Sequence, residues 1–391
     1  MDWSPQQDAA LKKISAWVRG RGKQWFYLAG YAGTGKTTLA MEMGDAAPGG
    51  SVLYASYTGK AALVMRKKGC RDARTIHSLI YTPEEDPDTG EVHFRLDPKS
   101  ELAGAGLLVI DEVSMVNEEI ASDLLSFGIP ILVLGDPAQL PPVKGAGFFT
   151  NNQPDMMLTE IHRQAKGNPI IELATRARGG ERLSAGRWAG AEGCALVMDW
   201  DGVPQKSLLA AGQVICGTNK TRRGLNASMR AALRATGALS APAPKQPDWM
   251  PVAGDKLICL KNNKDLGLFN GGLWTCLEVR DGPVHHPGTR KRQAERGVVY
   301  MTLSSLDEER GLTEVEVRQE FFQGREDDLT PRQRRPYHEF DFGYAITCHK
   351  SQGSQWDNVL VRDQSFVFAE MRDRWLYTAV TRAAQNLVVG R

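Results

Sequence analysis

The feature that most constrains how this chain can fold is a glycine-rich loop at residues 30–37, which reads GYAGTGKT. It fits the pattern G-x-x-x-x-G-K-[S/T], and it lies between an apolar run typical of a strand and a helix candidate that begins at Thr38. In such a loop the glycines let backbone N–H groups turn inward around phosphates, and the N-terminus of the following helix favours negative charge. Lys36 would reach the β- and γ-phosphates of a nucleoside triphosphate, and Thr37 would hold Mg²⁺.

A second constraint is the run at residues 107–110, four apolar side chains followed by Asp111 and Glu112. The run predicts a buried strand, and ligands of open α/β sheets bind beyond the carboxyl ends of the strands. Asp111 would hold Mg²⁺, whereas Glu112 would orient and deprotonate an attacking water. Two acids after a strand are common, and an exposed acidic strand end is the plain alternative. Together with the glycine-rich loop, the pair favours a nucleotide site.

Short apolar runs followed by turn signals recur along the chain and predict α/β architecture, with parallel strands joined by crossover helices. The runs lie at residues 25–29, 52–57, 107–110, 131–134, 214–217, 344–347, 359–361 and 387–389. They form an early and a late group, so the same kind of sheet is expected twice in the 391 residues. Three segments break the pattern, and one of them, residues 236–252, is rich in Ala and Pro and indicates a loop. Residues 82–104 are polar, with a hairpin candidate around 88–90, and residues 281–338 end in an alternation typical of a small β insertion.

Composition excludes several classes of protein. The net charge of +2 creates no global basic field, so a nucleic-acid site would have to be a local basic groove. No apolar run reaches the roughly 18 residues of a membrane span, and the N-terminus lacks a secretion signal, so a cytoplasmic protein without membrane contact is expected. The six cysteines are not spaced like a zinc knuckle or a redox pair, and we expect buried, reduced thiols and no Cys/His metal site.

Further strings follow one another in a fixed order. They are YTGKAA at 57–62, TIHSL at 75–79, VIDEVSM at 109–115, LGDPAQLPPV at 134–143, LTEIHRQ at 158–164, AITCHKSQG at 345–353 and LYTAVTRA at 376–383. Each string alone is modestly specific. In this order the set closely resembles the superfamily 1 helicases, in their RecD-like and Dda-like branch, and the resemblance runs from about residue 4 to residue 391. The paired prolines at 141–142 fit this branch, whose members move 5′→3′.

The resemblance implies a P-loop NTPase with two RecA-like parallel-sheet domains that share one ATP at their interface. The first would span residues 1–165, with a hairpin insertion at 82–104, and the second residues 166–391, with a β-barrel-like insertion at 270–338. The nucleotide-binding residues would be Gln7, Gly30, Ala32, Gly33, Thr34, Gly35, Lys36, Thr37, Thr38, Gln352 and Gly353. The catalytic residues would be Lys36, Glu112, Gln139, Arg163 and Arg382, with Thr37 and Asp111 on the metal.

Several of these roles have a physical reason. Arg163 and Arg382 match two arginine fingers, whose planar, permanently charged guanidinium groups stabilise negative charge spread over the γ-phosphoryl oxygens. A surface salt bridge is the ordinary role of an arginine, and only the matching strings single out these two. Gln139 would touch both the γ-phosphate and the DNA-facing segment and so couple them. Gln7, in the short string SPQQ at 4–7, would read the adenine.

The resemblance also implies a single DNA strand held by backbone contacts and stacking, without sequence readout. The DNA-facing positions would be Thr58, Gly59, Lys60, Thr75, His77, Ser78, Phe94, His349 and Lys350. For His77, a packed core histidine is the alternative. Phe94 would stack at the junction between single- and double-stranded DNA, and an ordinary surface loop is the alternative. A basic run at 290–292 would touch nucleic acid or form a solvated turn.

Three functions stay open at this point. The first is an ATP-driven helicase that acts as a monomer on single-stranded DNA and on junctions, with replication or recombination proteins as candidate partners. The second is a helicase-fold, nucleic-acid-binding subunit that has little activity outside a larger recombination or nuclease complex. The third is a simple P-loop kinase or GTPase, against which the second predicted sheet and the arginine strings argue.

Overall fold

The first sheet consists of continuous apolar strands because helices cover both of its faces. This computed structural model describes residues 3–20, 22–42, 51–85, 92–141, 147–160, 167–191, 193–240, 246–283, 293–309 and 311–391. The six strands run parallel, in the order β3 (Arg74–Thr75), β2 (Val52–Ser56), β6 (Leu107–Asp111), β7 (Ile131–Gly135), β1 (Trp25–Gly30) and β8 (Met156–Leu158).

Alternate side chains of these strands point to opposite faces, as strand geometry requires. Leu28 of β1 faces a cluster that includes α1, whereas its neighbour Tyr27 faces a cluster that includes α4 and α5. The helices of this half are α1 (Pro5–Gly20), α2 (Lys36–Met41), α3 (Gly59–Lys67), α4 (Ile76–Ile80) and α5 (Glu118–Ser126), with 3-10 turns η2 (Glu101–Gly104) and η3 (Val113–Met115). A hairpin of β4 (Tyr81–Glu85) and β5 (Val92–Leu96) extends from α4.

The second sheet repeats the parallel arrangement in the later part of the chain. Its order is β17 (Ala345–Thr347), β11 (Gln213–Cys216), β18 (Trp356–Arg362), β19 (Ala383–Gly390), β10 (Gly193–Met198) and β9 (Gly186–Gly190). All of its pairs are parallel except that of β9 with β10. Its helical elements are α6 (Pro169–Arg178), η5 (Trp200–Gly202), α7 (Gln205–Ala210), α8 (Asn219–Ala235), α11 (Cys348–Ser351), η7 (Ser365–Met371) and α12 (Arg372–Val380).

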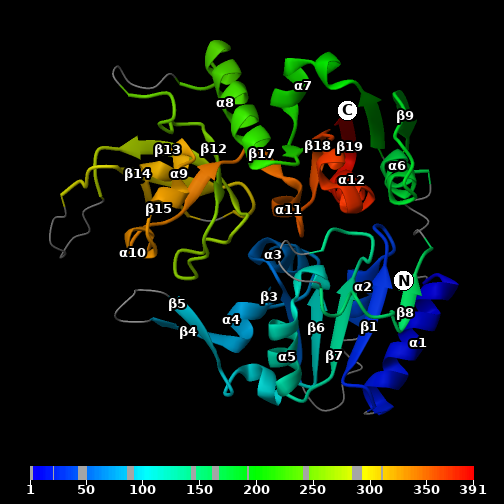
Figure 1. Ribbon diagram of the computed structural model, residues 1–391. Coiled ribbons are helices and arrows are strands. Elements are labelled where there is room, and N and C mark those ends of the chain that lie inside the picture. Colours follow the sequence, from blue (N-terminus) through cyan, green and yellow to red (C-terminus); the bar gives the residue numbers. More distant parts are fainter. Residues whose placement is uncertain are drawn as a thin grey trace.

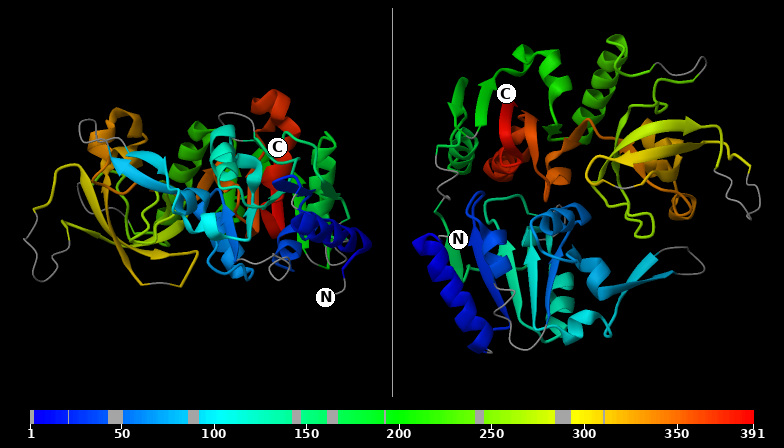
Figure 2. Two further views of the ribbon diagram at one scale, coloured as in Figure 1. Left: turned by 90° about the horizontal axis from the view of Figure 1, so that it is seen from below. Right: turned by 180° about the vertical axis from the view of Figure 1, so that it is seen from behind.

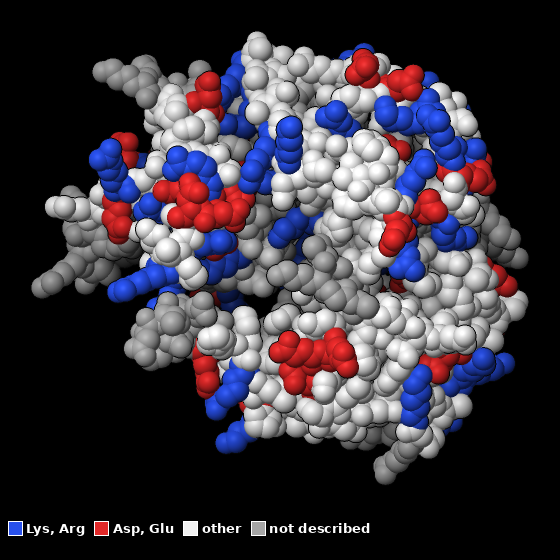
Figure 3. All heavy atoms as spheres, in the orientation of Figure 1, with Lys and Arg blue, Asp and Glu red and all other residues white. Residues whose placement is uncertain are grey.

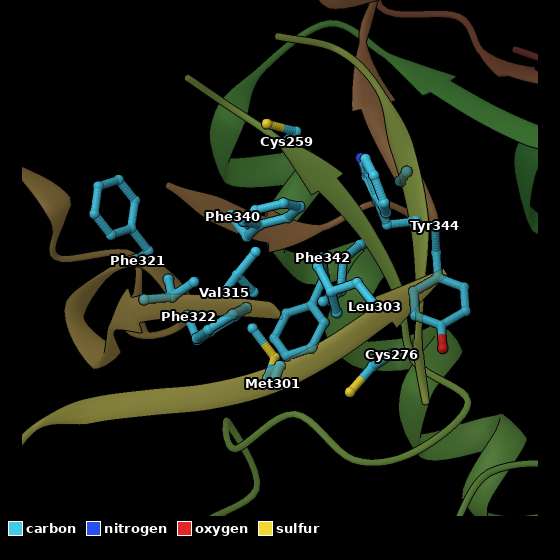
Figure 4. Close-up of a cluster of buried hydrophobic side chains, with 14 of the residues drawn as sticks. Cys259, Cys276, Met301, Leu303, Val315, Phe321, Phe322, Phe340, Phe342 and Tyr344 are labelled. Atoms are coloured by element: carbon cyan, nitrogen blue, oxygen red, sulfur yellow. The ribbon is translucent and has the colours of Figure 1, made fainter. Parts of the chain in front are cut away.

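A third, antiparallel sheet is inserted between α8 and β17. Its strands lie in the order β15 (Thr313–Arg318), β14 (Val298–Ser305), β13 (Leu273–Arg280), β12 (Lys256–Cys259) and β16 (Phe340–Phe342). Between β15 and β16 the chain forms α9 (Gln319–Gln323), η6 (Glu326–Asp328) and α10 (Pro331–Arg334). Figure 4 shows its apolar core, in which Cys259 and Cys276 lie among aromatic rings such as Phe342. None of the six cysteines forms a disulfide.

The two parallel sheets lie one above the other, with loops of both halves between them (Figure 1). The antiparallel sheet lies beside the second sheet, on the same side of the molecule as the hairpin, in both further views as well (Figure 2). Each of the eight predicted strands is present, so the expected α/β fold with two parallel sheets is confirmed. Strands β12 and β16 of the antiparallel sheet lie outside residues 270–338, the range expected for the insertion. No helix among the described residues is both long and apolar enough to cross a lipid bilayer.

Candidate active site

The glycine-rich loop joins β1 to α2 and folds tightly. Gly33 and Gly35 both have φ of 78°, a left-handed conformation that glycine adopts without a steric penalty. A Cβ on Gly30 would lie 2.6 Å from Thr34 Oγ1, so a side chain there would collide with the loop. Lys36 Nζ donates to the carbonyl oxygens of Gly30 at 2.5 Å and Tyr31 at 3.1 Å, which holds the ammonium at the mouth of the loop.

Two oxygen ligands suited to Mg²⁺ lie side by side at the edge of this loop. The Thr37 hydroxyl donates to Asp111 Oδ2 at 2.7 Å. Asp111 is the last residue of β6, so the sheet itself brings this carboxylate to the start of α2. Hydroxyl and carboxylate oxygens are the hard ligands that Mg²⁺ prefers, and the pair therefore fits the metal that the loop pattern implies.

Glu112 follows in a backbone conformation that is unusual for its type. Its φ is 54°, in the left-handed region, and its N–H donates to Asp111 Oδ1 at 2.8 Å. Burial raises the pKa of the Glu112 carboxyl above its ordinary value, and the neighbouring Asp111 acts in the same direction, while Arg382 and Lys36 oppose them. A carboxylate with a raised pKa is a better proton acceptor near neutral pH, as a general base must be.

These groups line one cavity of about 600 Å³ between the two halves. The expected site residues that line it are Gln7, Ala32, Gly33, Thr34, Gly35, Lys36, Thr37, Thr38, Asp111, Glu112, Gln139, Gly353 and Arg382. Gly30, the last residue of β1, lies close to Thr34 of the loop. Gln352 is buried nearby and donates to the carbonyl of Leu140 at 2.8 Å, a contact between the two halves. Arg163 lies outside the described residues.

Arg382 reaches the cavity from the second half. Its side chain is 5% exposed, and its guanidinium donates to the carbonyls of Thr378 and Ser354 and to the Thr381 hydroxyl at 3.0–3.1 Å. Arg382 is also a main electrostatic influence on the carboxyl of Glu112, so the two charges from opposite halves act on one another. Arg382 therefore lines the same cavity as the glycine-rich loop, although it belongs to the other half.

Two glutamines of the first half complete the expected set. Gln7 is buried and donates from Nε2 to the Thr34 carbonyl at 3.2 Å, which places its amide directly against the loop. Gln139 is 7% exposed, and its buried Oε1 accepts no hydrogen bond within the described part of the chain. Trp3, Asp136, Ser354 and Gln355 also line the cavity. Of these, Asp136 stands in the string LGDPAQLPPV and could have been found from the sequence.

The α3 segment expected to face DNA is covered in this structure. A Cβ on Gly59 would lie 2.7 Å from the Phe269 side chain, and Lys60 is 6% exposed. The Lys60 ammonium is paired with Asp307 at 3.2 Å and lies 4.6 Å from the centre of the Trp356 ring. Thr58 caps α3 by accepting from the N–H of Ala61. Lys60 is therefore not an exposed phosphate contact here, because an acidic loop of the insertion neutralises it.

The expected DNA-facing residues of α4 and the hairpin form an aromatic surface. The His77 ring lies 5.5–5.8 Å from those of Tyr57, Tyr81 and Phe94, and Phe94 is 56% exposed. His77 is only partly buried, so it is not a core histidine. Desolvation lowers the pKa of His77, which favours the neutral ring. Such a surface suits stacking against bases.

The remaining expected DNA contacts lie in or next to the short helices α4 and α11. Thr75 accepts from the N–H of Ser78 and caps α4, leaving Ser78 exposed. Lys350 is exposed and donates to Asn270 Oδ1 at 2.9 Å, and His349 lies 5.7 Å from the Phe368 ring. The basic run at 290–292 and the hairpin turn at 88–90 lie outside the described residues.

Charge is unevenly distributed around the hollow between the two halves. Figure 3 shows Lys and Arg of the upper half near that hollow, whereas an acidic patch covers part of the lower half. Glu118 and Glu119, the first residues of α5, are exposed on the lower half.

Two parallel sheets and a glycine-rich loop at the cavity between them define a P-loop fold with two RecA-like halves. Comparisons with known proteins narrow this class. Residues 2–196 match the AAA domain family, and residues 342–389 match the UvrD-like helicase C-terminal domain. The ATP-dependent RecD2 DNA helicase of Deinococcus radiodurans is 30% identical over 97% of this chain and 48% of its own length.

Two further proteins are similar to this chain, one in sequence and one in fold. The ATP-dependent DNA helicase dda of Enterobacteria phage T4 is 34% identical over 39% of this chain and 37% of its own length. A crystal structure of Bacteroides Pif1 bound to single-stranded DNA covers 100% of this chain and 92% of that chain, with a TM-score of 0.57 and 18% identity. The chain is therefore similar in sequence to the RecD2 and dda helicases, and its fold is similar to that of Pif1. It spans less than half the length of the RecD2 and dda relatives.

Proposed function

We propose that the chain is an ATP-dependent DNA helicase that moves 5′→3′ on single-stranded DNA and uses ATP hydrolysis to unwind duplexes ahead of it. One observation carries the proposal. The cavity that holds Lys36 and Glu112 of one half also holds Arg382 of the other half. A ligand between them therefore experiences both halves, and its hydrolysis changes how strongly the halves attract one another.

The geometry supports the following sequence of events. ATP binds with its phosphates on the loop, where Thr37 and Asp111 would hold Mg²⁺, which neutralises charge on the phosphate oxygens. The γ-phosphate attracts Arg382, and we expect Arg163 to approach as well, so the halves close. Glu112 accepts a proton from the attacking water, and Arg382 stabilises the charge that develops.

Loss of the γ-phosphate then weakens the attraction, and the halves separate again. If the DNA contacts of the two halves differ in strength between the closed and open states, each cycle moves the chain along the strand. The aromatic surface around Phe94 supplies a platform on which a junction base pair can stack. The strand direction comes from the family resemblance.

The first test is ATP turnover with and without single-stranded DNA. Lys36→Ala should abolish DNA-stimulated turnover while the protein still folds, because the substitution removes the ammonium that reaches the phosphates. Lys13→Ala, an exposed lysine on α1, is the matched control and should keep full turnover. Turnover in the Lys36→Ala variant equal to that of the wild type would refute the nucleotide assignment.

Direction is tested with duplexes that carry either a 5′ or a 3′ single-stranded tail. Unwinding of the 5′-tailed duplex alone is the expected result, and a preference for the 3′ tail contradicts the proposed direction. The second candidate, a subunit that needs a larger complex, is supported by the similarity to the RecBCD enzyme subunit RecD of Mycobacterium tuberculosis, which is 26% identical over 93% of this chain. DNA-stimulated ATPase without unwinding of either duplex would select that candidate.

A further inference from the structure

The hydroxyl of Tyr377 joins three elements of the nucleotide site. Tyr377 lies on α12 and is 1% exposed. Its oxygen accepts a hydrogen bond from the backbone N–H of Ala32 at 2.9 Å, and its proton is donated to Asp136 Oδ2 at 2.6 Å. Ala32 belongs to the glycine-rich loop, and Asp136 follows β7, so one side chain of the second half links two parts of the first.

The hydrogen bond to Ala32 matters because it involves a backbone N–H group of the glycine-rich loop. Backbone N–H groups of a glycine-rich loop are the donors that cradle phosphates. The Tyr377 hydroxyl is therefore an acceptor from the opposite half that engages a phosphate-binding donor directly. Arg178 of α6 contacts the same loop, with its guanidinium 3.4 Å from the centre of the Tyr31 ring.

The residue that follows Tyr377 on α12 connects the first half to Arg382. Thr378, the next residue on α12, accepts from the N–H of Leu140 at 2.9 Å, and its carbonyl accepts from Arg382 Nε at 3.0 Å. Leu140 follows Gln139, which lines the cavity. The position of α12 relative to the loop thus fixes the position of Arg382 relative to the phosphate site.

A buried tyrosine hydroxyl usually has a partner for packing reasons alone, and the chain provides a comparison. Tyr344 is 9% exposed, and its hydroxyl donates to Asp255 Oδ1 at 3.1 Å. Tyr344 and Asp255 both belong to the second half with its inserted sheet, and neither lines the cavity. A Phe substitution removes the same type of bond at both sites, but only at Tyr377 does that bond join the two halves.

We propose that Tyr377 is a positioning residue for ATP hydrolysis, whose hydroxyl keeps Arg382 in register with the phosphate loop through Ala32 and Asp136. This inference rests on the proposed ATPase function. Because Tyr377 acts through Arg382, its loss should affect the transition state more than the binding of ATP. Removing the hydroxyl also leaves the ring in place, so the packing of α12 is preserved.

The test is Tyr377→Phe, with Tyr344→Phe as the matched control, in single-turnover and steady-state ATPase assays. We expect kcat to fall roughly tenfold in Tyr377→Phe, with the KM for ATP changed by less than about twofold. Tyr344→Phe should keep kcat, whatever its effect on the thermal midpoint. In an Arg382→Ala background, Tyr377→Phe should slow turnover by less than about twofold further, because the residue through which it acts is already absent.

Each outcome is decisive. Wild-type turnover that disappears in Lys36→Ala establishes the ATPase independently of Tyr377. Given that turnover, an unchanged kcat in Tyr377→Phe, an equal loss in Tyr344→Phe, or a full tenfold loss on top of Arg382→Ala would each overturn the positioning role and leave the ATPase standing. A wild-type protein without turnover would overturn both.

Discussion

Glu112 holds a backbone conformation that glutamate seldom adopts. A φ of 54° in a residue with a Cβ costs on the order of 1–3 kcal/mol and persists only where the surroundings impose it. Here β6 and the bond from its N–H to Asp111 impose it. The result is a carboxylate directed into the cavity beside Lys36 and opposite Arg382, where a water attacking the γ-phosphate would stand.

Replacing Glu112 by Gln keeps the shape of the side chain but removes the base. We expect kcat for ATP to fall about 100- to 10,000-fold, while a fluorescent ADP analogue still binds. Glu118→Gln, an exposed glutamate of the same half, should leave turnover unchanged. A Glu112→Gln protein with near wild-type turnover would exclude Glu112 as the general base.

The same residue determines a pH dependence. Burial raises the pKa of Glu112, so the carboxyl takes up its proton at a higher pH than an ordinary glutamate does. A base works only when deprotonated, so kcat/KM for ATP, which reports the pKa of the free enzyme, should fall as the pH is lowered through that raised pKa. A pH profile of kcat/KM measures this acidic limb, and the residual activity of Glu112→Gln should not show it.

At the scale of elements, α8 is fixed to the inserted sheet by a buried ion pair. Arg230 on α8 donates to both carboxylate oxygens of Asp255 at 2.8 Å, and the two side chains are 5% and 0% exposed. Arg230→Ala would leave the carboxylate buried and unpaired, so we expect a loss of about 3–5 kcal/mol in the free energy of unfolding, measured with urea. Arg223→Ala, which breaks an exposed pair with Glu326, should cost less than about 1 kcal/mol.

The hairpin is a second element with a separable role. Phe94 lies on β5 and is 56% exposed, and the centre of its ring is 5.6 Å from that of His77 and 6.2 Å from that of Tyr81. Because more than half of the residue is exposed, Phe94→Ala should leave the fold and DNA-stimulated ATPase intact. Unwinding of a tailed duplex should drop several-fold, because the stacking surface at the junction is lost. Arg95→Ala on the same hairpin is the control. Equal unwinding by the Phe94 variant and the wild type would assign the hairpin no part in strand separation.

At the scale of the whole molecule, α3 is held against the insertion. Asp307 pairs with Lys60 and accepts from the N–H of Leu273, while Arg66 pairs with Glu308 at 3.5 Å. Asp307 thus pairs with Lys60, a cation that the family resemblance assigns to DNA. A DNA strand can therefore bind along α3 only if the insertion moves away. Otherwise the strand must follow another path.

Asp307→Asn distinguishes these possibilities. It leaves Lys60 buried without its counter-charge, which destabilises the contact between α3 and the insertion. We expect the affinity for single-stranded DNA to rise several-fold in fluorescence anisotropy at fixed ionic strength. Glu309→Gln, an exposed neighbour, is the control. Unchanged affinity in Asp307→Asn would show that DNA does not compete with this contact.

The two parallel sheets and most of the residues that line the cavity could be predicted from the sequence. Strands buried on both faces must be apolar throughout, and a loop that cradles phosphates must be rich in glycine, so local residue types reveal both. The strings also singled out Arg382, although it lies more than 300 residues from Lys36 in the chain.

The contacts between the two halves could not be predicted in this way, because they depend on how the whole chain packs. The link from Ala32 through Tyr377 to Asp136, and the neutralisation of Lys60 by Asp307, join residues that are far apart in sequence and ordinary in type. A tyrosine hydroxyl or a lysine ammonium carries no local mark of its partner. Its role follows from the elements that pack around it, and that packing is a property of the whole fold.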